Sequence, residues 1–90
     1  MFTSTKGPAR AVSPGRIIQR ELDERGWTRN DLADLMGRPS QAIREIINGK
    51  KQITAETALE LGEAFGIDPV FWSSLQSYWD AYGSHSNPAI

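Results

Sequence analysis

The sequence predicts an all-α domain built from five short helices. Apolar residues recur three and four positions apart, as at Ile18 and Leu22, and no segment alternates in the manner of a strand. Serine, threonine, aspartate and proline stand where helices begin, and glycine stands where they end. Ninety residues suffice for one small domain, and the absence of cysteine excludes disulfides and thiolate metal sites.

These start and stop signals define the helices in order. Ser13-Pro14 begins the first helix, because serine is a favoured cap and proline fits the first turn, and Gly26 ends it. Thr28 and Asp31 have the spacing of a capping box ahead of the second helix. The later helices are expected to begin at Thr28, Ser40, Thr54 and Asp68, and to end at Met36, Asn48, Gly66 and about Gly83.

The segments on either side of the helices lack periodicity. Residues 1–12 are expected to form a flexible arm and residues 84–90 a loose tail, which leaves 13–83 as the folded domain. No apolar run approaches the ~20 residues of a membrane span. Lys6 and Arg10 precede no apolar core of a signal peptide. These features and the missing cysteines favour a cytoplasmic protein.

Charge is divided unevenly along the chain. The net charge is −1, but all ten basic residues lie in 1–51, where six acids leave +4. Residues 52–90 carry five acids and no lysine or arginine, which gives −5. A basic half and an acidic half favour two partners of different charge.

Residues 32–46 have the spacing of a helix-turn-helix. Such a unit needs a small residue where its two helices press together, and Ala33 stands there. Its turn needs a residue tolerant of positive φ, and Gly37 follows four positions later. The apolar residues expected to pack between the two helices are Leu32, Met36, Ile43 and Ile46. Because all these offsets agree, the sequence favours DNA binding over two helices that pack for stability alone.

The third helix has an apolar side and a polar side. At 100° per residue its isoleucines share one arc. The opposite side carries Gln41, Arg44, Glu45 and Asn48, with Ser40 at the exposed N-terminal end. Glutamine reads adenine and arginine reads guanine, so Ser40, Gln41 and Arg44 are candidate base readers, and a solvated polar face is the alternative. Glu45 repels phosphate, so it either faces bases or orients Arg44.

Several groups beside this helix suit phosphate. Arg29 lies in the first turn of the second helix, where free N–H groups already favour an anion. Arg38 lies in the turn, Asn48 ends the third helix, and Lys50 and Lys51 follow it. We expect these five residues to hold the DNA backbone without reading sequence.

Further motifs are shared with one family. They include Ser13-Pro14-Gly15, Arg25-Gly26-Trp27-Thr28, Met36-Gly37-Arg38-Pro39, Ile53-Thr54-Ala55-Glu56-Thr57-Ala58 and Phe71-Trp72-x2-Leu75-Gln76. On these residues, the segment 13–79 resembles the HigA-type antitoxins, a branch of the phage-repressor-like (XRE) helix-turn-helix family with a lambda-repressor-like fold. The last two motifs are the most specific, since the helix-turn-helix part is common to many repressors.

The resemblance implies an antitoxin that holds a small, basic, HigB-like RNase toxin inactive and represses their shared operon as a homodimer. Carried over by position, Ser40, Gln41, Arg44 and Lys50 fall where such proteins touch operator DNA, and Arg29 at a phosphate. Some relatives add a zinc peptidase domain with a His-Glu-x-x-His motif. This chain has only His85, so we expect a stand-alone antitoxin with no metal or cofactor.

The fourth helix has an apolar arc of Ala58, Leu61, Gly62 and Phe65 and a separate arc of three acids. The acids are Glu56, Glu60 and Glu63. A solvated face is the ordinary interpretation. The sharper hypothesis is a docking surface for the toxin, because proteins that cut RNA are usually cationic.

The fifth helix is unusually aromatic. Phe71, Leu75, Tyr78 and Tyr82 form one stripe, and Trp72 and Trp79 lie further round the helix. One alternative places all six in the core, but so small a domain has little interior. We therefore predict that Phe71 and Leu75 are core and that Trp79 and Tyr82 are dimer contacts, since aromatic residues are favoured at interface centres.

These observations favour an antitoxin with autorepression. A stand-alone phage-type transcriptional repressor with no toxin partner is the alternative, and the basic stretch 29–51 disfavours a pure interaction module. An enzyme is not expected, because the sequence has one histidine, no Gly-rich phosphate loop and no cluster of metal ligands.

Overall fold

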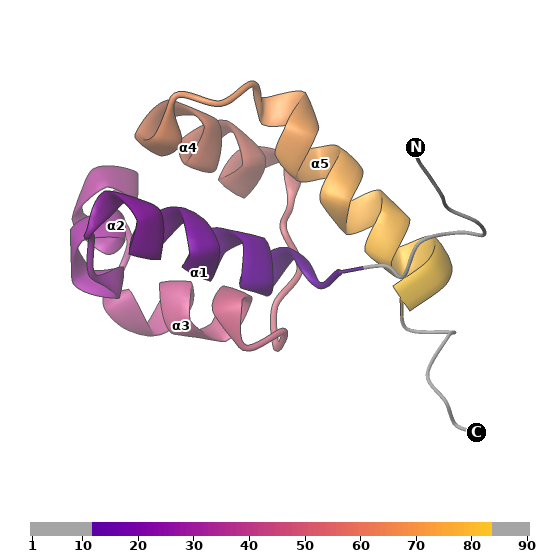
Figure 1. Cartoon of the computed structure of the whole chain (residues 1–90), viewed down its shortest axis with the longest axis horizontal. Coiled ribbons are helices and arrows are strands. Elements are labelled where there is room, and N and C mark those ends of the chain that lie inside the picture. The colour runs from indigo at the N-terminus through magenta and orange to yellow at the C-terminus, as the bar shows by residue number, and fades with distance from the viewer. Residues whose placement is uncertain (1–11, 84–90) are drawn as a thin grey trace, which may run out of the picture.

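The computed structural model of the protein describes residues 12–83, which form five α-helices and a closing π-helical turn (Figure 1). The elements are α1 (Pro14–Arg25), α2 (Arg29–Met36), α3 (Ser40–Ile47), α4 (Ala55–Phe65), α5 (Pro69–Tyr78) and the turn η1 (Trp79–Gly83). The all-α prediction is confirmed. Apart from Val12, the expected arm and tail lie outside the described residues. None of the helices between 12 and 83 has the length and hydropathy to cross a membrane.

Helices α2 and α3 form the predicted helix-turn-helix. Gly37 follows α2 with φ 68°, a left-handed conformation that costs glycine little because it has no Cβ. The Arg38 N–H closes the turn by donating to the Ala33 carbonyl at 3.0 Å. The capping box also forms, because Thr28 Oγ1 accepts from the Asp31 N–H at 3.1 Å and Asp31 Oδ2 accepts from the Thr28 N–H at 2.8 Å.

The apolar arcs predicted for the helices meet in one core. Its fully buried large side chains come from all five α-helices and are Ile18, Leu22, Leu32, Ile43, Leu61 and Trp72. Burying each such side chain favours folding by roughly 1.5–3 kcal/mol. Helices of eight residues, such as α2 and α3, are marginal alone in water, so this shared burial is what holds them.

The first turn of α1 packs directly on the last turn of α3. A Cβ on Gly15 would lie 2.1 Å from the carbonyl oxygen of Ile47, so only glycine permits this approach of two backbones. Pro14 begins α1 as predicted, although the Ser13 side chain makes no capping hydrogen bond. The position of α3 therefore depends on the α1 backbone as well as on side-chain packing.

The connection from α3 to α4 is held from α5. Gln76 Oε1 accepts from the Ile53 N–H at 2.8 Å, and Gln76 Nε2 donates to Asp80 Oδ1 at 2.9 Å. Thr54 then caps α4, and its side chain accepts from the Thr57 N–H at 3.2 Å. The predicted start of α4 is thus confirmed, and a buried glutamine ties it to the last helix.

The prediction for α5 assigned the wrong edge of its aromatic surface to the core. Trp72 is fully buried, whereas Phe71, expected in the core, is 40% exposed. The Trp72 ring lies 5.6 Å from the Phe65 ring and 5.0 Å from the Phe71 ring. Leu75 packs against the core but is only partly buried. An apolar stripe this wide has two edges, and helical spacing does not say which one faces inward.

The π-helical turn η1 completes α5 and ends at Gly83, where the sequence predicted the helix to end. The Trp79 ring lies against Gly83 so closely that a Cβ there would come within 1.9 Å of a ring carbon. Trp79 is consequently half-buried by its own chain, while Tyr82 is 54% exposed.

Candidate nucleic-acid interface

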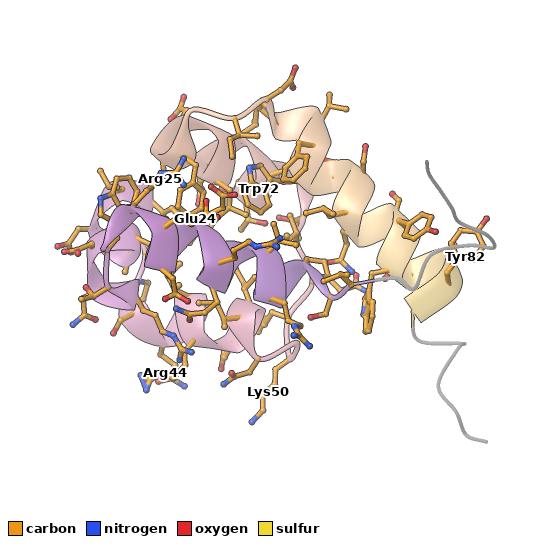
Figure 2. All side chains as sticks on the ribbon, in the orientation of Figure 1. Glu24, Arg25, Arg44, Lys50, Trp72 and Tyr82 are labelled. Carbon is orange, nitrogen blue, oxygen red and sulfur yellow. The ribbon has the colours of Figure 1, made fainter. Side chains whose placement is uncertain are left out.

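The outer side of α3 and the loop after it present a row of polar side chains. Gln41, Arg44, Asn48 and Lys50 are exposed, and Ser40 is half-buried at the start of the helix. Figure 2 shows Arg44 and Lys50 pointing away from the body of the protein on the α3 side. The division of α3 into a buried isoleucine side and an outward polar side matches the sequence prediction.

Two polar hollows flank Arg44. The larger, about 500 Å³, lies where the first turns of α2 and α3 meet and is lined by Thr28, Arg29, Asn30, Ser40 and Arg44. The smaller, about 230 Å³, runs along the outer side of α3 and is lined by Gln41, Arg44, Glu45, Asn48 and Lys50. The structure therefore brings most of the predicted DNA contacts onto one continuous surface.

The larger hollow has the chemistry of a phosphate site. The first N–H groups of a helix lack carbonyl partners within it; in α2 the Thr28 side chain takes the N–H of Asp31, and the first-turn residues Arg29 and Asn30 line this hollow. Arg29 Nε donates to Gln19 Oε1 at 3.1 Å, a contact with α1 that the sequence did not predict. Gln19 thus holds the Arg29 guanidinium beside the α2 N-terminus, where it adds positive charge.

The loop after α3 places two lysines beside the smaller hollow. The Glu45 carbonyl accepts from the Lys50 N–H at 2.8 Å and from the Lys51 N–H at 3.2 Å. Asn48 N–H donates to the Arg44 carbonyl at 2.9 Å and Gly49 N–H to the Ile46 carbonyl at 3.1 Å, so α3 ends in a tight turn. Both lysine side chains are exposed, as a contact with the DNA backbone requires.

Glu45 places a carboxylate among these donors. Its Oε2 accepts from Gln41 Nε2 at 3.4 Å, and its Oε1 lies 4.0 Å from Lys51 Nζ. The sequence left open whether Glu45 orients Arg44. The carboxylate instead contacts Gln41 on one side and Lys51 on the other.

Arg38, predicted as a phosphate contact, is engaged elsewhere. Its Nη2 donates to Glu60 Oε2 at 3.0 Å, and its guanidinium also lies 3.6 Å from Glu56. The hydrogen bond that Arg38 donates to Glu60 raises the pKa of Arg38 above its ordinary value. A phosphate would have to compete with this ion pair. Nothing in the sequence joins two residues 22 positions apart, so the contact could not be predicted.

The same contact divides the acidic arc of α4. Glu60 is half-buried and paired with Arg38, whereas Glu56 and Glu63 are exposed. The carboxylates of the arc are therefore not equivalent: Glu56 also lies 3.6 Å from the Arg38 guanidinium, and only Glu63 has no ion pair among the described residues.

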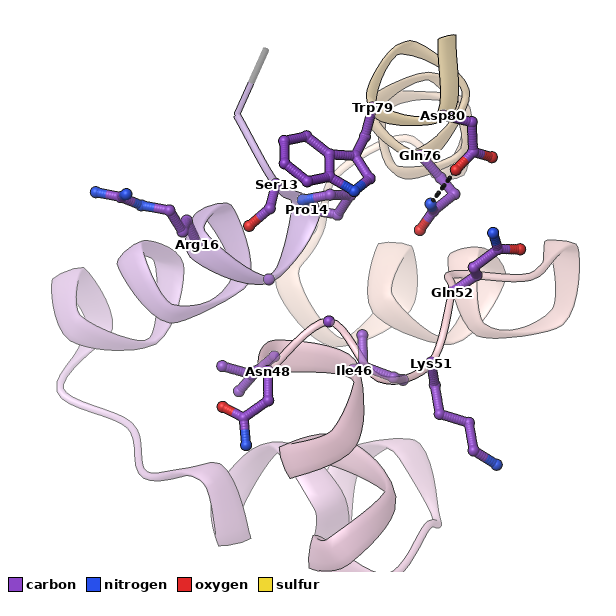
Figure 3. Close-up of a pocket in the computed structure, with 13 residues that line it drawn as sticks. Ser13, Pro14, Arg16, Ile46, Asn48, Lys51, Gln52, Gln76, Trp79 and Asp80 are labelled. Carbon is purple, nitrogen blue, oxygen red and sulfur yellow. Dashed lines mark hydrogen bonds between the residues drawn. The ribbon is translucent and has the colours of Figure 1, made fainter. Parts of the chain in front are cut away.

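The end of α5 carries an exposed aromatic surface. The Tyr78 and Tyr82 rings lie 4.7 Å apart, and both are exposed. The Trp79 indole lies above Ser13 and Pro14 at one wall of a cleft of about 640 Å³ (Figure 3). Of the two predicted dimer contacts, Tyr82 is thus free to meet another chain, and Trp79 is largely occupied within its own.

A small core, a tight glycine turn and an outward polar α3 define a helix-turn-helix protein. The chain belongs to the helix-turn-helix family HTH_3, whose model matches residues 18–72. Virulence-associated protein A' of Dichelobacter nodosus is 40% identical over 68 residues, which make up 74% of this chain and 59% of that protein. The chain thus spans less than two thirds of the length of this relative.

Solved antitoxin structures share the fold. An addiction-module antidote protein of the HigA family from Coxiella burnetii is 38% identical, with a TM-score of 0.75 over 81% of this chain and 80% of that one. The Pseudomonas aeruginosa antitoxin HigA, solved with the higBA promoter, is 27% identical, with a TM-score of 0.71 over 90% and 96%. The resemblance to HigA-type antitoxins that the sequence motifs indicated is confirmed.

Proposed function

We propose that this protein is an antitoxin that represses its own operon by binding operator DNA as a dimer and that neutralises a cognate, HigB-like RNase toxin. The observation that carries the proposal is the outer side of α3, where Arg44 stands exposed between two polar hollows. The fold shared with a HigA antitoxin that was solved with promoter DNA supports the same reading of this surface.

In this proposal α3 lies in the major groove and its outward side chains read base edges. The readers are Ser40, Gln41 and Arg44, of which glutamine suits adenine and arginine suits guanine. The proposed backbone contacts are Arg29, Asn48, Lys50 and Lys51. The first three line the two hollows, and Lys51 is exposed in the loop after α3. Arg38 joins them only when it leaves Glu60.

Dimerisation places two α3 helices about 34 Å apart on one side of the duplex, as two half-sites require. The exposed tyrosines of α5 and η1 support a seam there, because Tyr82 and Tyr78 offer a continuous aromatic surface. Trp79 contributes at most the outer edge of its ring, since its other side lies on Gly83.

The toxin is proposed to dock on the acidic arc of α4, Glu56, Glu60 and Glu63. In Figure 1 this helix lies across the molecule from α3, so DNA and a toxin need not exclude each other. An RNase must hold phosphates and therefore carries a basic surface that acidic side chains attract.

A stand-alone repressor is the second candidate function. It shares the DNA interface and differs only in having no toxin. The Arg38 contacts favour it, because they balance two of the three glutamates within the molecule.

The DNA part is tested by enriching a randomised duplex pool on the purified protein. We expect a palindromic sequence with half-sites about one helical turn apart. The Arg44→Ala variant, passed over the same pool, is the control and is expected to lose preference at one base pair of each half-site. Failure of the wild-type protein to enrich any sequence contradicts the proposal.

The toxin part is tested by co-expressing the reading frame beside the gene. An antitoxin restores growth and co-purifies with the neighbouring product, whereas a stand-alone repressor does neither. Glu56→Lys with Glu63→Lys is expected to slow association and reduce its salt dependence. The matched control also reverses two exposed acids, Glu24→Lys on α1, labelled in Figure 2, with Asp34→Lys on α2. Unchanged capture by the α4 variant argues against the acidic docking surface.

A further inference from the structure

An acid on a surface that meets DNA works against binding, because every phosphate nearby repels it. Glu45 nevertheless lies in the smaller hollow, with Arg44 and Lys50 among its neighbours. Its two contacts are directed to Gln41 and Lys51, one a proposed base reader and the other a proposed phosphate contact. The position of the carboxylate therefore bears on both modes of DNA contact at once.

We propose that Glu45 is a specificity-determining residue that lowers the affinity for DNA of any sequence while it holds Gln41 ready to read one base. This inference rests on the proposed binding of DNA through α3. Two separate contacts carry it, and each predicts its own effect.

The contact with Glu45 fixes the orientation of the Gln41 side-chain amide. Gln41 and Glu45 are one helical turn apart, and the carboxylate accepts from Nε2 at 3.4 Å. An ionised carboxylate has only acceptors, so it binds the NH₂ end of the amide and never the carbonyl end. Gln41 is left with its Oε1 and one N–H directed outward. An outward acceptor beside a donor matches the N6 and N7 edge of adenine.

The contact with Lys51 reduces positive charge at the interface. Lys51 Nζ lies 4.0 Å from Glu45 Oε1, and the Lys51 backbone N–H is bonded to the Glu45 carbonyl as well. Binding to any duplex depends on cations that replace counterions at phosphates. A lysine paired with Glu45 releases fewer counterions, and so contributes less to the affinity for a duplex of any sequence. The base contact through Gln41 is recovered only on the matching sequence, so the ratio of specific to non-specific affinity rises.

Two substitutions separate these effects. Glu45→Gln removes the charge and keeps an oxygen that can accept from Gln41, whereas Glu45→Ala removes both. The probes are the duplex enriched by the wild-type protein and a scrambled duplex of equal composition, titrated over a range of salt concentrations. Glu63→Gln on α4 is the matched control, because it makes the same change in net charge at an exposed position away from α3.

Both Glu45 variants are expected to bind the scrambled duplex several-fold more tightly, with a log–log salt slope steeper by about 0.9, the value for one added phosphate contact. Glu45→Ala is expected to lose preference at the base pair that Gln41 reads, and Glu45→Gln to retain most of it. The Glu63→Gln control is expected to leave the slope unchanged.

Three results overturn the inference. In the first, both Glu45 variants bind the scrambled duplex with the same affinity and the same salt slope as the Glu63→Gln control. Another is a Glu45→Ala protein that keeps full preference at the Gln41 base pair. The last is strict additivity of Gln41→Ala and Glu45→Ala in a double-mutant cycle, since coupled residues deviate from it. A wild-type protein that enriches no duplex instead contradicts DNA recognition itself, and the two failures are thereby distinguished.

Discussion

Helices α3 and α5 are both short and amphipathic, yet they use their outer sides differently. Opposite its isoleucines α3 carries only polar groups, so the spacing of the sequence alone defines its buried side. Helix α5 is apolar over a wider arc, and both Trp72 and Phe71 qualify as core by spacing. The structure buries one and exposes the other. A helix with a polar outer side can face water or nucleic acid. A helix with apolar residues on its outer side as well retains an exposed apolar surface that another protein can cover.

The strongest test of this comparison truncates the two aromatic residues of α5, Trp72 and Phe71, one at a time. Trp72→Ala is expected to lower the free energy of unfolding by about 3–5 kcal/mol, because it opens a cavity in the core. Phe71→Ala is expected to cost about 1 kcal/mol at low protein concentration, since its ring is 40% exposed. Denaturant unfolding measures both. Equal losses would mean that the two edges of α5 are packed alike.

The outer edge of α5 is tested by Tyr82→Glu. A charge placed in an apolar seam is left buried and unpaired, so we expect a folded monomer with operator affinity lowered at least tenfold. Light scattering gives the mass, and far-ultraviolet circular dichroism checks the fold. Ser77→Glu, also exposed on α5, is the control. A wild-type protein that is already monomeric at high concentration refutes the seam.

On α3, Arg44→Ala is expected to weaken operator binding by about 1–3 kcal/mol, mostly through lost discrimination between base pairs. Arg20→Ala on α1 removes an equal charge from an exposed site and serves as the control. Binding to operator and scrambled duplex is compared at one salt concentration. Equal weakening on both duplexes assigns Arg44 to the backbone instead of the bases.

Lys50→Ala is expected to have a smaller and more uniform effect. The side chain is exposed after α3 and suits a phosphate, so operator and scrambled duplex should weaken alike. The log–log salt slope should become shallower by about 0.9. An unchanged slope removes Lys50 from the interface.

The smallest effect is expected for Arg38→Ala. Its pair with Glu60 is partly exposed, with 29% and 24% of the two side chains accessible, and such pairs stabilise folding by at most about 1 kcal/mol. Because Arg38 is occupied by Glu60, DNA affinity should fall less than in Lys50→Ala. A larger loss than in Lys50→Ala would show that Arg38 leaves Glu60 to bind phosphate.

Most of the fold could be predicted because its determinants are local. The capping pair Thr28 and Asp31, the turn at Gly37 and the isoleucine side of α3 each follow from neighbours fewer than eight positions apart. The candidate DNA surface followed with them, since it is the side of α3 left over once the buried side is known.

What could not be predicted depends on contacts between separate elements of the fold. Arg29 meets Gln19 on another helix, and Arg38 meets Glu60 across 22 positions. The choice between Phe71 and Trp72 depends on how α5 packs against α4, because Phe65 lies only seven positions before Trp72 but on a different helix. Helical periodicity describes one helix at a time. Each of these contacts joins two separate helices or turns, so it depends on how they pack together.

Gly15 has a consequence that extends beyond its own helix. Its backbone lies directly against the backbone of Ile47, so a single methyl group added there would force the start of α1 and the end of α3 apart. In the proposed complex, Arg44 and Lys50 would then meet different positions on the duplex, although no side chain of α3 had changed. If α3 binds DNA as proposed, its alignment on the duplex depends partly on the absence of a side chain at Gly15, on the side of α3 that faces α1.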